Sequence, residues 1–150
     1  MLDFCDALEK NMDVKWKEAG EYSPLVLAYI GDAVFEIIIR SRVVAIANMQ
    51  VKKMHGVTEG VVKAQTQSAL VELVSDMLTD EEEAVYKRGR NAKSHSVAKN
   101  ASIQDYRRAT GFEALLGYLY LKKDFERMTE IVEAGIERYK ENTGKDLFQI

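Results

Sequence analysis

The apolar residues of this chain recur mostly at helical spacing, and one stretch is apolar on nearly every side. It runs from Leu25 to Ile39 and follows Ser23 and Pro24, an N-cap residue and a first-turn proline. A helix that is apolar all round belongs in a core or at a subunit contact. We therefore predict a helix that begins after Ser23, runs to about Ala47, and organises the rest of the chain.

The segments on either side of this helix show weaker patterns. Residues 1–21 predict a short helix and then a mobile approach to the central helix. Residues 51–78 predict a helix with a break or kink near Gly56 or Gly60. Four uncharged polar residues interrupt its apolar stripe. They form either a solvated face or the lining of a groove for sugar and phosphate oxygens: Gln65, Thr66, Gln67 and Ser68.

Capping patterns predict the helices of the C-terminal half. Thr79 and Glu82 have the spacing of a capping box, so a helix is expected to begin after Thr79. Two more helices are expected over residues 103–122 and 125–141, each after a residue that caps N-termini. The sequence thus predicts an all-α fold.

Composition and charge narrow the class of protein. A length of 150 residues suits one domain with a real core. The single cysteine, Cys5, excludes an internal disulfide, and the sequence shows neither a signal peptide nor a membrane-spanning run. We expect a cytoplasmic protein. The net charge of -3 means that any nucleic-acid surface must come from local clustering.

The charge balance inverts between residues 87 and 108, where seven Lys and Arg residues face one acid, Asp105. Lys87, Arg88 and Arg90 suit the end of the helix that begins after Thr79, and the small polar residues between the cations favour a loop. A solvated basic loop is common, yet cations interleaved with Asn and Ser are also what binding to phosphates requires. Because the protein as a whole is acidic, we favour the phosphate-binding interpretation. The candidate residues are Arg88, Arg90, Asn91, Lys93 and Ser94.

Acidic residues inside two apolar helices are the candidate catalytic groups. Asp32 and Glu36 lie in the central helix, and Glu113 lies on one face with Thr110 in the helix over residues 103–122. A buried carboxylate is costly unless it finds a hydrogen bond, a cation or water. One interpretation is that these acids are structural carboxylates, each satisfied by hydrogen bonds within the protein. Acids from two packed helices can also hold a hard divalent cation, with water and a substrate phosphate completing its shell.

Three segments resemble the ribonuclease III family of endonucleases. Tyr29-Ile-Gly-Asp-Ala-Val34 looks like its signature, and Thr110-Gly-Phe-Glu-Ala-Leu-Leu-Gly117 resembles its second acidic motif. Lys87-Arg-Gly-Arg-Asn-Ala-Lys-Ser94 is similar to a loop of the short bacterial branch, Mini-ribonuclease III. The three motifs stand in the family's order. We therefore expect an N-terminal extension (1–21), a ribonuclease III catalytic domain (22–141) and a C-terminal tail (142–150), without an appended double-stranded-RNA-binding domain.

This resemblance implies the all-helical ribonuclease III fold, a homodimer, and hydrolysis of double-stranded RNA with Mg²⁺ or Mn²⁺. The implied substrate is precursor 23S ribosomal RNA, cut in the stem that pairs its ends. Asp32 would be the essential catalytic acid and Glu113 its metal-binding partner. The basic segment would bind the RNA. Whether a ribosomal protein helps to present the substrate is left open.

The sequence also departs from the larger members of the family. They carry glutamates where this chain has Leu25 and Ala28, and an aspartate where it has Thr110. As members of the short branch share these losses, they support the assignment to that branch, but they leave the number of metal ions open. Glu36 is either an acid that orders water near the metal or a buried hydrogen-bond acceptor.

Two other interpretations remain at this point. The chain could be a catalytically silent ribonuclease III fold that only binds structured ribosomal RNA. It could also be a helical protein-interaction module with structural acids and a solvated basic loop. The presence of both Asp32 and Glu113 favours the enzyme, because a binding protein gains nothing from acids that face phosphates.

Overall fold

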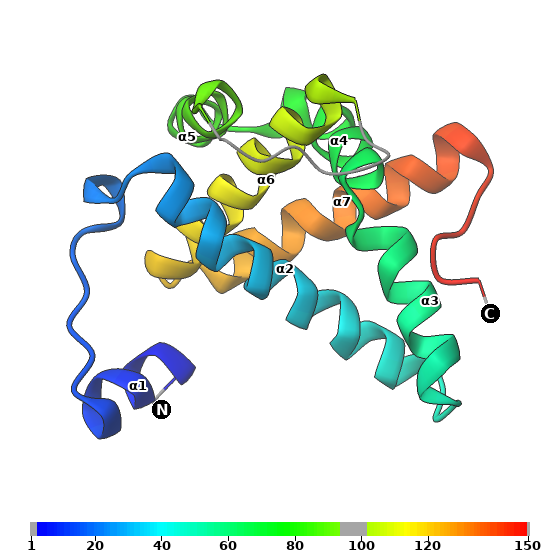
Figure 1. Cartoon of the computed structure of the whole chain (residues 1–150), viewed down its shortest axis with the longest axis horizontal. Helices are drawn as coiled ribbons and strands as arrows, with labels where there is room; N and C mark the ends of the chain where they lie inside the picture. The colour runs from blue at the N-terminus through cyan, green and yellow to red at the C-terminus, as the bar shows by residue number, and fades with distance from the viewer. Residues whose placement is uncertain (1–2, 94–101, 150) are drawn as a thin grey trace.

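The protein is described by a computed structural model that covers residues 3–93 and 102–149, and these ranges contain helices and no strand. The prediction of an all-α fold is confirmed. None of the helices in these ranges has the length and apolar character needed to cross a membrane. The helices, shown in Figure 1, are α1 (Phe4–Met12), α2 (Pro24–Ile46), α3 (Val51–Val62), α4 (Ala64–Leu73), α5 (Asp80–Asn91), α6 (Ile103–Leu121) and α7 (Phe125–Thr143), with short 3-10 turns η1 (Ala19–Glu21) and η2 (Ser75–Met77).

Local capping fixes the helix ends that the sequence predicts. The Ser23 hydroxyl accepts the Val26 N–H at 3.3 Å, and α2 begins there. Thr79 and Glu82 form the reciprocal capping box, with N···O distances of 3.1 and 2.9 Å. At the end of α7, Gly144 takes a left-handed conformation with φ 73°, which glycine adopts without steric penalty.

The break between α3 and α4 lies at Lys63, whose backbone is extended, rather than at Gly56 or Gly60. The predicted position of the break was therefore wrong, since both glycines lie inside α3. The physical reason is that side chains stabilise the break. Thr66 and Gln67, in the first turn of α4, each donate a hydrogen bond of 2.7 Å to a carbonyl near the end of α3.

Helix α6, rather than α2, is the centre of the packing. It contacts α2, α4, α5 and α7, and Figure 1 shows it in yellow crossed by α2 in blue. Its residues from Ala109 to Tyr120 are buried, apart from the partly exposed Glu113. Helix α2 keeps large apolar side chains on the surface, including Tyr29 and Ile37. The apolar stretch around which we expected the chain to be organised is therefore half core and half exposed surface.

Both terminal segments pack on the helical core. In α1, Cys5 is buried and Asp6 forms an ion pair with Lys123 at the end of α6. Near the C-terminus Phe148 is buried, with the Arg42 guanidinium 4.4 Å from its ring centroid. The domain boundaries expected after residues 21 and 141 remain predictions.

Two glycines allow the backbones of α2 and α6 to touch. A Cβ atom on Gly31 would lie 1.7 Å from the Glu113 carbonyl oxygen, and one on Gly117 would lie 2.0 Å from the Leu27 carbonyl oxygen. No side chain fits at either position, so the two helices approach as closely as their backbones allow. This approach places Asp32, the residue after Gly31, beside Glu113.

We predict that Gly31→Ala destabilises the protein by at least about 3 kcal/mol, because an atom placed inside a backbone contact forces the helices apart. Gly56→Ala is the matched control, since no atom lies within 4 Å of its Cβ position. That variant should gain about 0.5–1 kcal/mol from the better helix propensity of alanine. Chemical unfolding measures both changes. Equal effects of the two substitutions would contradict the account of the helix contact.

Candidate active site

The structure brings Asp32 and Glu113 together in one surface groove between α2 and α6. The groove has a volume of about 720 Å³, and Asp32 is exposed to it whereas Glu113 is partly buried. Its walls otherwise combine apolar side chains with Glu36, Thr110 and two tyrosines. The other residues that line it are Leu25, Ala28, Tyr29, Ile30, Ala33, Glu36, Tyr106 and Thr110.

The environment of Glu113 disfavours its negative charge. Burial, a side-chain hydrogen bond with Asp32 and the charge of Asp32 together raise the pKa of the Glu113 carboxyl to about 8, while a hydrogen bond from Gln67 opposes the shift. Two carboxylates held this close are mutually repulsive unless a proton or a cation lies between them. The pair therefore fits a hard divalent cation, which prefers carboxylate oxygens.

The protein supplies few ligands to such a cation. Among residues 3–93 and 102–149, no group of three or more His, Cys, Asp or Glu side chains is placed to hold a metal ion. Leu25 and Ala28, which stand where larger family members have glutamates, are apolar parts of the groove wall. The remaining coordination positions would thus fall to water and to substrate oxygens.

Glu36 and Thr110 line the same groove, but both are engaged elsewhere. Glu36 is partly exposed and accepts a hydrogen bond from Arg40, one turn along α2, at 3.1 Å. The Thr110 hydroxyl donates to the Tyr106 carbonyl at 3.0 Å. Glu36 is thus a hydrogen-bond acceptor, though not a fully buried one, and its role in ordering water stays a prediction.

Gln67 also contacts the site through Glu113, a contact that the sequence did not predict. Thr66, Gln67 and Ser68 are buried, so neither the solvated face nor the open groove predicted for this polar stretch is correct for them. The Gln67 amide nitrogen lies 3.4 Å from Oε2 of Glu113. A polar residue within an apolar stripe signals burial with a partner, but the sequence could not show that the partner is 46 residues away.

The basic segment is partly helical. Arg88, Arg90 and Asn91 belong to the last turn of α5, as expected for cations that suit the end of this helix, and Lys93 follows it, so the loop expected from the small polar residues can begin only after Asn91. Ser94 lies outside the described residues. Arg90 and Asn91 line a second hollow of about 620 Å³, whose other wall comes from α4 and the start of α6: Glu72, Ile103, Gln104, Arg107 and Arg108.

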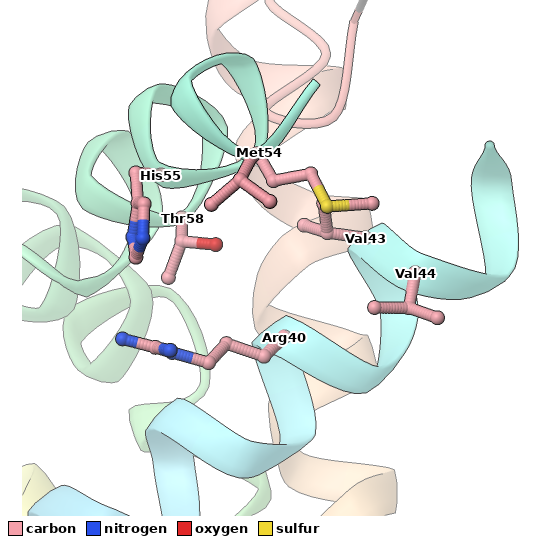
Figure 2. Close-up of a pocket in the computed structure, with 7 residues that line it drawn as sticks. Arg40, Val43, Val44, Met54, His55 and Thr58 are labelled. Carbon is pink, nitrogen blue, oxygen red and sulfur yellow. The ribbon is translucent and has the colours of Figure 1, made fainter. Parts of the chain in front are cut away.

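A smaller pocket between α2 and α3 is a poor candidate for the active site. Figure 2 shows Arg40 of α2 reaching toward His55 of α3, beside Val43, Val44 and Met54. Its volume is about 120 Å³ and its lining is mostly apolar. Since it contains no acid, the groove of Asp32 and Glu113 is the candidate active site.

Comparison with known proteins identifies the class. Residues 25–124 match the family described as the Ribonuclease III domain, which together with the all-helical fold defines a ribonuclease III endonuclease. Within that family the chain belongs to the Mini-ribonuclease 3 branch, as its similarity to curated members shows. It is therefore an endoribonuclease.

The similarity extends along most of the chain. The Mini-ribonuclease 3 of Clostridium tetani is 50% identical over 85% of each chain. That of Thermoanaerobacter sp. strain X514 is 48% identical over 88% of this chain and 94% of its own. A crystal structure of a protein from Fusobacterium nucleatum matches with a TM-score of 0.73 and 28% identity, covering 81% of this chain and 98% of that one.

The raised pKa of Glu113 predicts a stability that depends on pH in the metal-free protein. Between the ordinary carboxyl value of 4.5 and about 8, the unfolded chain has released this proton and the folded chain retains it. The contribution of Glu113 to the free energy of unfolding therefore falls as pH rises through this range. Glu113→Gln cannot ionise and should gain stability relative to wild type between about pH 5 and pH 8. Thermal unfolding in the presence of a chelator measures this, and a difference independent of pH would contradict the assignment.

Proposed function

We propose that this enzyme cleaves double-stranded RNA by divalent-metal-dependent hydrolysis in the groove between α2 and α6. The observation that carries the proposal is the pair of carboxylates, Asp32 and Glu113, which share an open groove and a side-chain hydrogen bond. The proposed substrate is precursor 23S ribosomal RNA, cut in the stem that pairs its ends. The products would carry 5′-phosphate and 3′-hydroxyl ends.

Asp32 and Glu113 would hold the Mg²⁺ or Mn²⁺ on which this family generally depends. A bound divalent cation activates water and stabilises developing charge on phosphate oxygens. The exposed Asp32 faces solvent, where an RNA phosphate can reach it, while the partly buried Glu113 is held by its neighbours. Since these two acids are the main charged groups available, we expect weak metal affinity until RNA supplies further oxygens.

The second hollow offers a site for the phosphate backbone. Arg90 and Asn91 from α5 face Gln104 and Arg107 from α6 across it, while Arg108 is paired with Glu72 at 3.1 Å. Duplex RNA is recognised mainly through its shape, its phosphates and its 2′-hydroxyl groups. Cations and amides on two neighbouring helices suit such contacts. Any specificity for the precursor would then come from the stem's shape or from a ribosomal protein that presents it.

The exposed apolar face of α2 supports a homodimer. A separate groove, which we call the apolar groove, is lined almost wholly by apolar side chains of α1, α2, α6 and α7, including Phe4, Ile37 and Phe125. It shares Ile30 and Ala33 with the groove of the two acids. A second copy docked here would lie next to the active site. A two-fold axis would then supply one site for each strand of a duplex.

Substitution of the two acids tests the proposed chemistry. Asp32→Asn keeps the shape of the side chain and removes its charge, so cleavage should fall at least about 10³-fold, as loss of several kcal/mol of metal-dependent stabilisation implies. Glu113→Gln should behave similarly. The measurement is single-turnover cleavage of a duplex with saturating Mg²⁺, and Glu126→Gln, at an exposed position of α7, is the charge-matched control. Cleavage by Asp32→Asn at the wild-type rate would disprove the assignment.

The role of the basic segment in RNA binding can be tested separately from the cleavage chemistry. If Arg88, Arg90 or Lys93 contacts a phosphate, its replacement by Ala should weaken binding to all duplexes alike and flatten the salt slope by about one unit. Affinity across a salt series, in an Asp32→Asn background, measures this. Lys140→Ala on α7 is the control. If all three variants keep the wild-type slope and affinity, the RNA is held elsewhere.

The dimer is tested by placing a charge on the apolar groove. Ile37 is 61% exposed, so Ile37→Asp should leave the fold of the subunit intact. Burying an unpaired carboxylate at a subunit contact is costly, so the variant should sediment as a monomer at micromolar concentration while wild type sediments as a dimer. Ile37→Ala is the control for side-chain loss. A wild-type monomer that cuts both strands together would refute the homodimer.

A further inference from the structure

We propose that Gln67 is a positioning residue that orients the Glu113 carboxylate for its divalent cation without touching the cation. The inference rests on the proposed function. Gln67 joins three helices: it belongs to α4, it bonds the end of α3, and it contacts a carboxylate of α6.

The first contact determines which way the amide faces. Gln67 is 2% exposed, and its Nε2 lies 2.7 Å from the carbonyl oxygen of Val62. Helix α3 ends at Val62, so this carbonyl lacks the helical partner that a continuing helix would provide. A carbonyl oxygen only accepts hydrogen bonds, so the amide nitrogen, and not the amide oxygen, must face it. The geometry of the chain break therefore fixes the side-chain orientation.

The second contact reaches the active site. Nε2 carries two hydrogens, and with one directed to Val62 the other can serve Glu113, whose Oε2 lies 3.4 Å away. This contact anchors one oxygen of the Glu113 carboxylate to the protein, and a divalent cation would replace the hydrogen bond that the carboxyl makes with Asp32. A carboxylate anchored by one oxygen has less rotational freedom, so less is lost when it binds the cation.

The amide oxygen of Gln67 argues against a role in packing alone. Oε1 is buried and has no hydrogen-bond partner in the described part of the chain. An unpaired buried acceptor is unfavourable, and leucine would fill a similar volume without one. Apolar packing at this position therefore does not favour glutamine, whereas donation to the Val62 carbonyl and to Glu113 does.

Thr66 provides a matched control. It is also buried, and its hydroxyl donates to the Gly60 carbonyl at 2.7 Å, at the same break between α3 and α4. Thr66→Val and Gln67→Met thus each remove one side-chain bond to the end of α3. Only Gln67→Met also removes the contact with Glu113.

The test measures binding of Mn²⁺ to the RNA-free protein by electron paramagnetic resonance. Loss of a residue that orients a metal ligand typically lowers metal affinity about 10–100-fold, so Gln67→Met should raise the Mn²⁺ dissociation constant at least about 10-fold. Thr66→Val should stay within about twofold of wild type. The Mg²⁺ concentration that half-saturates duplex cleavage should shift in parallel, while duplex affinity in chelator stays unchanged. Wild-type Mn²⁺ affinity in Gln67→Met, or an equal loss in Thr66→Val, would overturn the proposal.

A second measurement decides the matter if Gln67→Met does not fold. In the nuclear magnetic resonance spectrum of the wild-type protein, Mg²⁺ should shift the side-chain amide signals of Gln67 and not those of exposed Gln50. Unshifted Gln67 signals in a protein that binds Mg²⁺ would refute the role. A wild-type protein that cleaves no duplex with Mg²⁺ would instead refute the proposed function.

Discussion

The close approach of α2 and α6 at Gly31 is the constraint on which the rest of the structure depends. At that point the missing side chain lets the backbone of α2 rest on the backbone of Glu113. A second glycine contact, at Gly117, repeats the approach one turn further along α6. Because Asp32 follows Gly31 directly, the same contact that packs the core sets the spacing of the two acids.

The closeness of Asp32 and Glu113 makes the doubly ionised pair unfavourable, and this penalty fits the proposed binding of a cation. Burial and Asp32 raise the pKa of Glu113 to about 8, so the metal-free site destabilises the ionised pair. A divalent cation bound by both acids would relieve the repulsion and would stabilise the folded state through its free energy of binding. The apolar wall formed by Leu25 and Ala28 adds no further charge. In the proposed mechanism, substrate oxygens would complete the metal's coordination shell and so couple metal binding to RNA binding.

The sequence predicted those features of the fold that depend on residues close together in the chain. The N-caps at Ser23 and Thr79 are recognisable from residues within one helical turn, and the structure contains both. The predicted position of the break between α3 and α4 was wrong, since the break at Lys63 is stabilised by side chains of the next helix rather than by a glycine. The contact of Gln67 with Glu113 joins α4 to α6, and no local pattern specifies it. The pairing of Asp32 with Glu113 was predicted because each acid stands inside an apolar helix, and such helices must pack on each other.

The most direct test of the account is to locate the metal. Crystals of the wild-type protein with a duplex that resists cleavage, soaked in Mn²⁺, would show the ion by anomalous scattering. The account predicts a peak between the Asp32 and Glu113 carboxylates, in contact with an RNA phosphate and absent from Asp32→Asn crystals. A peak elsewhere, or an RNA backbone that does not enter the groove between α2 and α6, would contradict it.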